Sequence, residues 1–288
     1  MFRLLSFLFF SVMMISCKDK KPALFSLTDK SDTGIDFRNN LQPSTEIDIM
    51  KYTYFYNGGG VAIGDINNDG LQDVFFTGNM VKNRLYLNKG NFEFENITQS
   101  SNVTVKQGWS TGVTMVDINN DGFLDIYVCQ SADYSPERRK NLLYVNNGDL
   151  TFTERAEQYG LADQGYSTQA SFFDYDKDGD LDMFLINHSL QQYTTGAQEN
   201  PEVRKIKNPD FASKLYRNDK GRFKDVSEEA GITSNVLTFG LGLAISDVNN
   251  DNWPDVYVSN DFNEPDYLFI NNKNGTFTDQ MKESLDQI

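Results

Sequence analysis

The sequence has few of the residues that most often carry catalysis or form cross-links. It contains one histidine, two cysteines and seven prolines in 288 residues, and it has no P-loop, Cys-x-x-Cys or His-x-x-x-His motif. A catalytic triad would have to rely on His188 alone. Two cysteines allow at most one disulfide, so a disulfide framework is excluded.

Positive charge is also scarce. The 26 Lys and Arg residues are outnumbered by 41 Asp and Glu residues, which gives a formal net charge of −15. This balance argues against nucleic acid or an anionic membrane surface as a partner. The aromatic content of 13% is higher than a disordered chain carries, and the length suffices for one large domain or two small ones.

A hydrophobic stretch long enough to cross a membrane is missing as well. The mostly apolar run at the N-terminus, residues 4–15, has 12 residues, whereas a spanning helix needs about 20. Residues 1–16 are therefore predicted to be a signal peptide. Cys17 follows the small residue Ser16 and precedes a polar stretch, which resembles a bacterial lipoprotein signal.

That resemblance implies cleavage before Cys17, lipidation of this residue, and a tether over residues 17–24. The protein is then expected outside the cytoplasm, in the periplasm or on the cell surface, with the lipid on Cys17 as its only contact with the membrane. The alternative is an ordinary secretory signal that ends in a chance cysteine. If Cys17 is acylated, Cys129 has no disulfide partner, and a bound metal would have to supply any cross-link.

A nine-residue acidic pattern occurs four times in the sequence. The copies occupy residues 65–73, 117–125, 174–182 and 247–255, and each places Asp or Asn at positions 1, 3, 5 and 9. Three copies have Gly at position 6, whereas the fourth has Asn252, the next most tolerant residue for a left-handed backbone. Alternate oxygen side chains around a sharp turn favour a hard cation, and Ca²⁺ accepts irregular shells of 6–8 oxygens.

The acidic pattern could also indicate an EF-hand or dockerin-like loop, or a simple turn. An EF-hand or dockerin-like loop requires a carboxylate at position 12, and that position is apolar in all four copies: Phe76, Val128, Leu185 and Val258. Asp, Asn and Gly clusters can also be simple turns, but four copies in one strand context favour calcium. Four Ca²⁺ ions would reduce the formal charge from −15 to −7.

Each acidic loop lies between short apolar runs rich in β-branched and aromatic residues, which predicts strands. Two further strand-like runs follow in each repeat, the first of them typified by Leu85-Tyr86-Leu87-Asn88. Four strands per repeat predict a β-propeller blade or a β-solenoid turn. The third repeat carries a long insertion, roughly from His188 to Ala212.

The segment 25–35 looks like a fourth strand followed by a turn, because Phe25 and Gly34-Ile35 resemble Phe223 and Gly231-Ile232 in their order. A stray outer strand of this kind would close a propeller ring.

These features resemble the FG-GAP/VCBS repeat family, which includes the integrin α-subunit propeller and cartilage acidic protein-like secreted proteins. The resemblance covers Phe25 to about Met281 and implies an all-β propeller over residues 25–288. Because family propellers usually have seven blades, four repeats are expected to be part of a larger ring. The resemblance also implies up to four Ca²⁺ ions on one face and ligand-binding loops, here the insertion, on the opposite face.

By position, the family implies side-chain ligands at positions 1, 3, 5 and 9 of each loop and a main-chain carbonyl at position 7. The resulting ligand sets are Asp65, Asn67, Asp69, Leu71 and Asp73; Asp117, Asn119, Asp121, Phe123 and Asp125; Asp174, Asp176, Asp178, Asp180 and Asp182; and Asp247, Asn249, Asp251, Trp253 and Asp255.

No motif indicates an enzyme. Gly108-Trp109-Ser110-Thr111-Gly112 matches the G-x-S-x-G nucleophile elbow, but a strand instead of the required helix is expected after it. We therefore expect a calcium-stabilised, lipid-anchored binding or adhesion module for a protein or glycan ligand. The alternatives are a structural or assembly part of a larger envelope protein, and a propeller-type glycan hydrolase or lyase.

Overall fold

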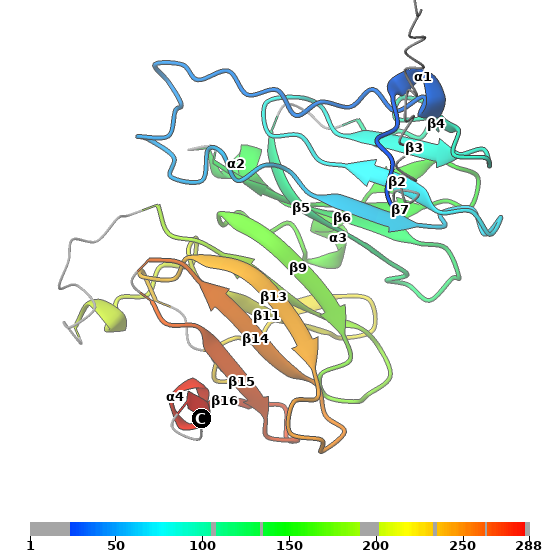
Figure 1. Cartoon of the computed structure of the whole chain (residues 1–288). Coiled ribbons are helices and arrows are strands. Elements are labelled where there is room, and N and C mark those ends of the chain that lie inside the picture. Colours follow the sequence, from blue (N-terminus) through cyan, green and yellow to red (C-terminus); the bar gives the residue numbers. More distant parts are fainter. Residues whose placement is uncertain are drawn as a thin grey trace, which may run out of the picture.

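The structure is a computed structural model that describes residues 24–104, 108–132, 135–190, 202–232, 235–262 and 264–285. These residues fold into four antiparallel sheets of four strands each, joined by loops and short helical turns (Figure 1). The predicted all-β class and the four-stranded repeats are confirmed. The predicted signal peptide, 1–16, and all but the last residue of the predicted tether, 17–24, lie outside the described residues.

Each sheet is one sequence repeat, and each strand pairs with the next one along the chain. We call the sheets blades 1 to 4. Their strands are β1 (Val61–Gly64), β2 (Asp73–Phe76), β3 (Arg84–Asn88) and β4 (Phe94–Asn96); β5 (Trp109–Val116), β6 (Asp125–Ser131), β7 (Leu142–Asn146) and β8 (Phe152–Glu154); β9 (Ser167–Phe173), β10 (Asp182–Asn187), β11 (Lys214–Asn218) and β12 (Phe223–Asp225); and β13 (Gly240–Ser246), β14 (Asp255–Asn260), β15 (Tyr267–Asn271) and β16 (Phe277–Asp279). The helical turns are α1 (Lys30–Thr33), α2 (Pro136–Arg139), α3 (Ala156–Tyr159), η1 (Val203–Lys205) and α4 (Met281–Leu285).

Within these ranges, no helix combines the length and the apolar character needed to cross a bilayer.

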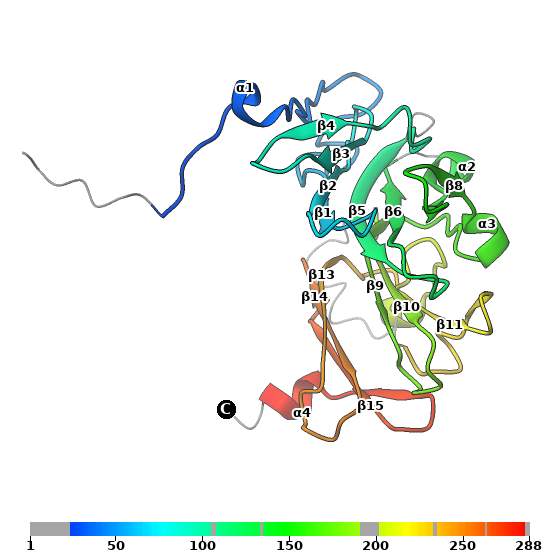
Figure 2. The ribbon, with the colours of Figure 1, turned by 90° about the vertical axis from the view of Figure 1, so that its right-hand side faces the viewer.

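The first strands of successive blades lie side by side, so the blades follow one another around a common side (Figure 2). Threonine hydroxyls join these strands: Thr111 and Thr114 of β5 donate to the carbonyls of Ser167 and Ala170 at 2.7 Å. The approach is close enough that a Cβ on Gly112 would lie 2.3 Å from the Thr168 carbonyl oxygen. This is why small residues recur where each blade begins.

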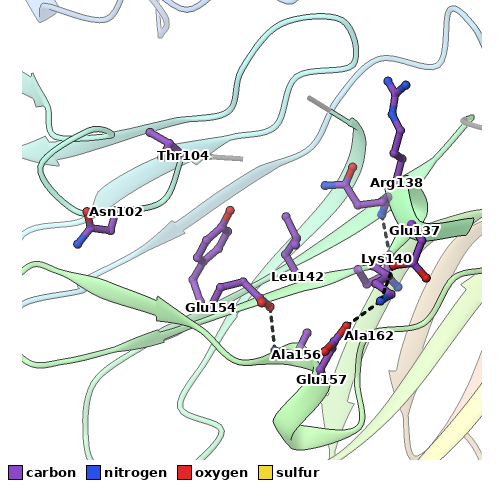
Figure 3. Close-up of a pocket in the computed structure, with 13 residues that line it drawn as sticks. Asn102, Thr104, Glu137, Arg138, Lys140, Leu142, Glu154, Ala156, Glu157 and Ala162 are labelled. Carbon is purple, nitrogen blue, oxygen red and sulfur yellow. Dashed lines mark hydrogen bonds and ion pairs between the residues drawn. The ribbon is translucent and has the colours of Figure 1, made fainter. Parts of the chain in front are cut away.

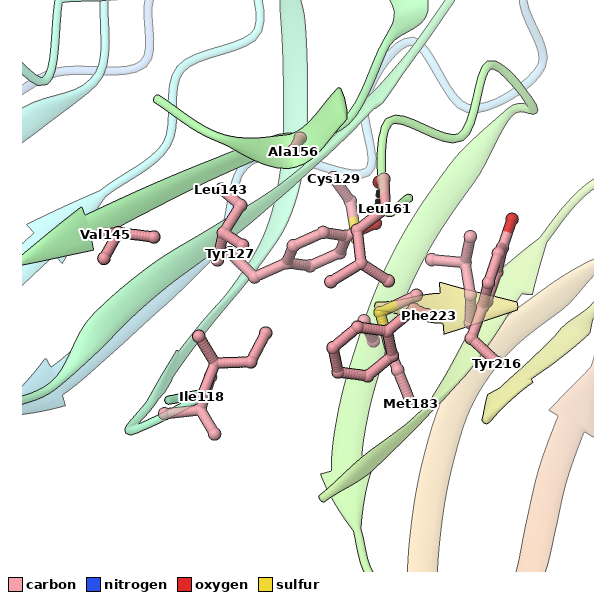
Figure 4. Close-up of a cluster of buried hydrophobic side chains, with 13 residues drawn as sticks. Ile118, Tyr127, Cys129, Leu143, Val145, Ala156, Leu161, Met183, Tyr216 and Phe223 are labelled. Carbon is pink, nitrogen blue, oxygen red and sulfur yellow. Dashed lines mark hydrogen bonds between the residues drawn. The ribbon is translucent and has the colours of Figure 1, made fainter. Parts of the chain in front are cut away.

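Three apolar cores hold neighbouring blades face to face. The core between blades 2 and 3 contains Tyr127 and Leu143 from one sheet and Met183 and Leu185 from the other, all fully buried (Figure 4). Equivalent clusters join blades 1 and 2 and blades 3 and 4. Cys129 lies in the first of these cores as a buried free thiol, as predicted, and burial raises its pKa.

The predicted strand within residues 25–35 is wrong, although the glycine turn expected after it is present. Residues 24–29 form no strand, and the helical turn α1 ends at Gly34 (φ 76°). Gly34 packs on the carbonyl of Phe94 in blade 1, just as Gly160 packs on that of Phe223 in blade 3. An outer strand needs a neighbouring third strand, and those of the four described blades already pair with β4, β8, β12 and β16. Leu24, Phe25 and Leu27 are therefore more than 90% exposed.

A strap formed by residues 36–57 runs along the end of the blades opposite the acidic loops. It is attached to blade 1 by Asn39, whose side-chain amide donates to Asn79 Oδ1 at 2.6 Å. Farther along, Tyr52 packs edge-on against Trp109 of blade 2, and Tyr54 against Phe239 beside blade 4. The strap thus contacts blades that are distant from one another in the sequence.

The single histidine lies beneath this strap. His188 is buried, and its Nε2 lies 3.1 Å from the Tyr52 hydroxyl and 3.0 Å from Ser131 Oγ. Its Nδ1 lies 3.0 Å from the Ser189 carbonyl oxygen, so Nδ1 carries the proton. Burial lowers the pKa of His188 to about 4, which keeps the ring neutral at physiological pH.

The insertion lies between β10 and β11, as predicted, and residues 191–201 of it are outside the described residues. Its described part packs on blade 4: Arg204 Nη1 of η1 lies 2.9 Å from the buried Glu264 carboxylate. In Figure 1, η1 and the strap lie on the left, whereas the arrowheads of β9 and β13, which precede acidic loops, point to the lower right. The insertion is therefore at the end of the blades opposite the acidic loops, as the resemblance implied.

Candidate metal centres

All four acidic loops connect the first and second strands of a blade, and all lie within the described residues. We call them loops 1 to 4. At position 6 the backbone is left-handed in each, with φ of 85°, 88° and 98° at Gly70, Gly122 and Gly179 and 69° at Asn252. This confirms why glycine or asparagine is required there. Position 4 is left-handed as well, including Lys177 at 62°, which the sequence did not indicate.

The aspartate at position 9 is the structural centre of each loop. Asp125 is fully buried; its Oδ2 accepts from the backbone N–H of Ile118 at 3.0 Å, and its Oδ1 from that of Asn146 at 2.7 Å. The same two bonds recur at Asp73, Asp182 and Asp255, with distances from 2.8 to 3.1 Å. One carboxylate therefore joins the start of the loop to the third strand of its blade.

These buried carboxylates are electrostatically costly without a counter-charge. Burial raises the pKa of Asp125 to about 6 and that of Asp182 to about 7, although the backbone amides oppose the shift. Burial also raises the pKa of Asp73, and the neighbouring carboxylates of Asp69 and Asp65 add to the effect. A cation held by the loop would offset this cost.

Each third strand ends in an asparagine, and two of these asparagines extend the linkage into the neighbouring blade. Asn146 Nδ2 donates to the Ile66 carbonyl of loop 1 at 2.9 Å, and Asn271 Nδ2 donates to the Tyr175 carbonyl of loop 3 at 2.8 Å. Sequence reasoning did not assign a role to these asparagines. The signal for them was the recurrence of Asn after the Leu-Tyr/Phe pair, at residues 88, 146, 218 and 271.

In loops 1, 2 and 4, most carboxylate oxygens accept hydrogen bonds from other groups of the same loop. In loop 1, Asp65 Oδ1 accepts from the N–H of Asp69 at 3.1 Å and its Oδ2 from that of Gly70 at 2.7 Å. The Asn67 amide also donates to Asp69 Oδ2 at 2.9 Å. Loop 2 has the same three bonds, and loop 4 has the two backbone bonds.

Loop 3 is the exception. Oxygens of Asp174, Asp176 and Asp182 lie within 4.8 Å of one another, the only such acidic group among the described residues. Asp174 Oδ1, Asp176 Oδ1 and Asp180 Oδ1 are buried and have no hydrogen-bond partner. A hard cation among Asp174, Asp176 and Asp182 would satisfy the unpartnered oxygens of the first two, so the donor set present in this loop fits Ca²⁺.

The predicted ligands thus fall into groups. Positions 1, 3 and 5 face one another within loops 1, 2 and 4, as the hydrogen bonds between them show. In loop 3 it is positions 1, 3 and 9 whose oxygens lie together. Position 9 is bonded to two backbone amides in all four loops. The main-chain carbonyls of Leu71, Phe123, Asp180 and Trp253 stay predictions.

A separate cavity of about 390 Å³ lies at the outer rim between blades 1 and 2 (Figure 3). Asn102 and Thr104 of blade 1 face Leu142 and Glu154 of blade 2 across it. Lys140 lies 2.7 Å from both Glu137 and Glu157, which neutralises its charge. The α2 residues that line this cavity place it toward the strap end of blade 2, away from the acidic loops.

We predict that Asp125→Ala lowers the free energy of unfolding by about 2–4 kcal/mol even without metal, because two buried N–H groups lose their acceptor. Asp121→Ala, at an exposed position of the same loop, should cost less than about 1 kcal/mol under the same conditions. Guanidinium unfolding in excess chelator measures both. Equal losses in the two variants would contradict a structural role specific to position 9.

Comparison with known proteins agrees with this geometry. Residues 65–128 and 132–185 each match the family described as FG-GAP-like repeat. Cartilage acidic protein 1 of Xenopus tropicalis is 27% identical over 216 residues, which cover 75% of this chain and 30% of the relative. The mouse protein of the same name is 25% identical over 236 residues, covering 76% of this chain and 34% of the relative.

The chain therefore spans about a third of the length of the curated relatives that it matches. The repeat matches begin at the first aspartate of loop 1 and end within β10, so they include loops 1 to 3. The recurring acidic loop and the four-stranded blades agree with these matches: the chain contains two FG-GAP-like repeats, at residues 65–128 and 132–185, within an all-β fold of β-propeller type.

Proposed function

We propose that this protein is a calcium-stabilised, lipid-anchored binding module outside the cytoplasm, with a protein or glycan as its ligand. The observation that carries the proposal is the set of buried, unpartnered carboxylate oxygens in loop 3, within a fold that repeats the same loop four times. A propeller of FG-GAP repeats is a binding or structural scaffold, so the role of the metal is to hold the blades together.

Structural calcium sites are supported by where the loops attach. Each loop is bonded through its position 9 aspartate to the third strand of the same blade, and loops 1 and 3 are bonded to the next blade. An ion held in such a loop would therefore stiffen both a blade and an interface. Rigid loops with three or four charged ligands suit calcium at the millimolar levels found outside cells.

Ligand recognition is proposed at the strap end of the blades. The strap, the described part of the insertion and the rim cavity between blades 1 and 2 all lie toward that end. The opposite end is formed by the acidic loops. Binding at the strap end would leave the metal sites free for their structural role.

A non-catalytic role is also proposed. Ser110 lies inside β5, and Gln130 Nε2 donates to its Oγ at 2.9 Å. His188 is buried beneath the strap, with both ring nitrogens in hydrogen-bonding contacts. Neither residue is therefore arranged as an exposed nucleophile or its base.

Calcium should raise the melting temperature of the protein, because the ion binds the folded state alone. At a calcium concentration a hundredfold above Kd, each occupied site adds about 2.7 kcal/mol. Magnesium should act more weakly because it demands a strict octahedral shell. Differential scanning calorimetry in calcium, magnesium and chelator tests this, and identical melting temperatures in all three would refute the structural role.

Lipid attachment is testable on the full chain, which has only two cysteines. In a bacterial host, wild type and Cys129→Ser should incorporate an alkyne-labelled fatty acid and fractionate with membranes. Cys17→Ser should do neither, because it lacks the predicted acceptor thiol. Label retained by Cys17→Ser would show that the anchor is elsewhere or absent.

Binding and catalysis are separated by one array experiment. The calcium-loaded protein is applied to immobilised glycans, and bound sugars are then analysed for cleavage by mass spectrometry. A binding module retains particular glycans and leaves them intact. Cleaved products would contradict the non-catalytic role, and an array without binding would leave a protein as the proposed ligand.

A further inference from the structure

Loop 3 differs from the other three loops in its number of charges. Its five odd-numbered positions are all aspartate: Asp174, Asp176, Asp178, Asp180 and Asp182. Loops 1, 2 and 4 have three aspartates each, with asparagine at position 3 and an apolar or aromatic residue at position 7. The two extra carboxylates, Asp176 and Asp180, are therefore specific to loop 3.

These two extra carboxylates are also the ones that the protein leaves unsatisfied. Asp176 Oδ1 and Asp180 Oδ1 are buried and lack a hydrogen-bond partner, as does Asp174 Oδ1 beside them. In loop 1, by contrast, Asn67 donates its amide to the position 5 carboxylate, and Leu71 at position 7 offers no side-chain oxygen. Asp176 has no amide to donate, so loop 3 lacks this bond, although the Gly179 N–H still donates to Asp174 Oδ2 at 3.2 Å.

The positive side chains near loop 3 make their ion pairs and ring contacts outside it. Lys177 extends toward blade 4, with its Nζ 4.8 Å from the centre of the Trp253 ring. Arg217 is bonded to Asp219 at 2.9 Å, and Lys273 lies 3.2 Å from Asp251 of loop 4. Burial raises the pKa of Asp176 and the charge of Arg217 opposes this shift, but Arg217 offsets only part of the negative charge of the loop.

A cavity gives such an ion access to the loop. About 440 Å³ of space lies between loop 3 and the hairpin of β15 and β16, and Asp176 and Asp178 line it together with Trp253 and Thr276. Waters in this space would complete the 6–8 oxygens that Ca²⁺ prefers. Trp253 also places an indole beside the site, which can report on a bound lanthanide.

We propose that loop 3 is the tightest of the four cation sites, because the Asp176 carboxylate occupies the position at which the other three loops have asparagine. This inference rests on the proposed calcium binding and adds a ranking of the sites to it. Calcium affinity increases with the charge of the ligands and the rigidity of the site. Loop 3 therefore fills first as calcium rises, and it joins blades 3 and 4 before the other loops are loaded.

The test compares Asp176→Asn with Glu229→Gln. Glu229 lines the same cavity as Asp176 but belongs to the turn after β12, so its loss removes a nearby charge without removing an oxygen from the loop. Calcium binding is measured by calorimetric titration, and Tb³⁺ binding by Tb³⁺ luminescence on excitation of tryptophan. We expect Asp176→Asn to weaken the tightest calcium site tenfold or more, and Glu229→Gln to change it less than threefold.

Thermal melts give a second measurement. A residue with a purely structural role would not change the melting temperature in opposite directions with and without calcium. In chelator, Asp176→Asn should melt at a higher temperature than wild type, because two like charges no longer repel each other. In saturating calcium the same variant should lose part of the stabilisation that the ion gives. The reciprocal variant Asn67→Asp should tighten loop 1.

The two proposals fail in different ways. Calcium binding with four equal affinities, unchanged tight binding in Asp176→Asn, or a lower melting temperature of that variant in chelator would overturn the ranking. Wild-type protein that binds neither calcium nor Tb³⁺ would overturn the proposed function itself.

Discussion

The structure depends on one buried carboxylate in each blade. The aspartate at position 9 accepts a backbone N–H from the start of its acidic loop and another from the end of the third strand. It thereby fixes both the bend between the first two strands and the register of the third. Because the carboxylate is buried, its negative charge carries a desolvation cost, and a cation bound in the loop would offset that cost.

The same arrangement couples blades to one another. The asparagine whose backbone N–H makes the third-strand contact also donates its side-chain amide to the loop of the preceding blade. Asn146 of blade 2 donates to loop 1, and Asn271 of blade 4 donates to loop 3. Apolar cores cover the rest of each interface, with residues such as Phe184 and Phe269 fully buried between blades 3 and 4. The loops therefore act on the blade interfaces as well as on the turns that contain them.

The sequence predicted the repeats, their strands and the acidic loops because each depends on a local pattern. Alternating Asp and Asn, a glycine at position 6 and flanking β-branched runs are all visible within about 20 residues. The strap contacts were not predictable in this way. Tyr52, Ser131 and His188 meet across separations of 79 and 136 residues, and no periodicity connects them.

The failed strand prediction has the same origin. Phe25 and Gly34 resemble an outer strand and the glycine turn after it, and this turn forms because it packs on the adjacent blade 1. A strand also needs a hydrogen-bonding neighbour, which local sequence does not specify. The difference among the four loops was visible as Asp176 and Asp180, but its meaning required knowing which oxygens the fold leaves without partners.

Anomalous diffraction from crystals grown in millimolar calcium shows directly whether the four acidic loops bind cations. We expect a cation peak inside each loop, strongest in loop 3, with carboxylate oxygens at 2.3–2.6 Å from the ion. Loops without anomalous signal at saturating calcium, in blades folded as described, would contradict this expectation.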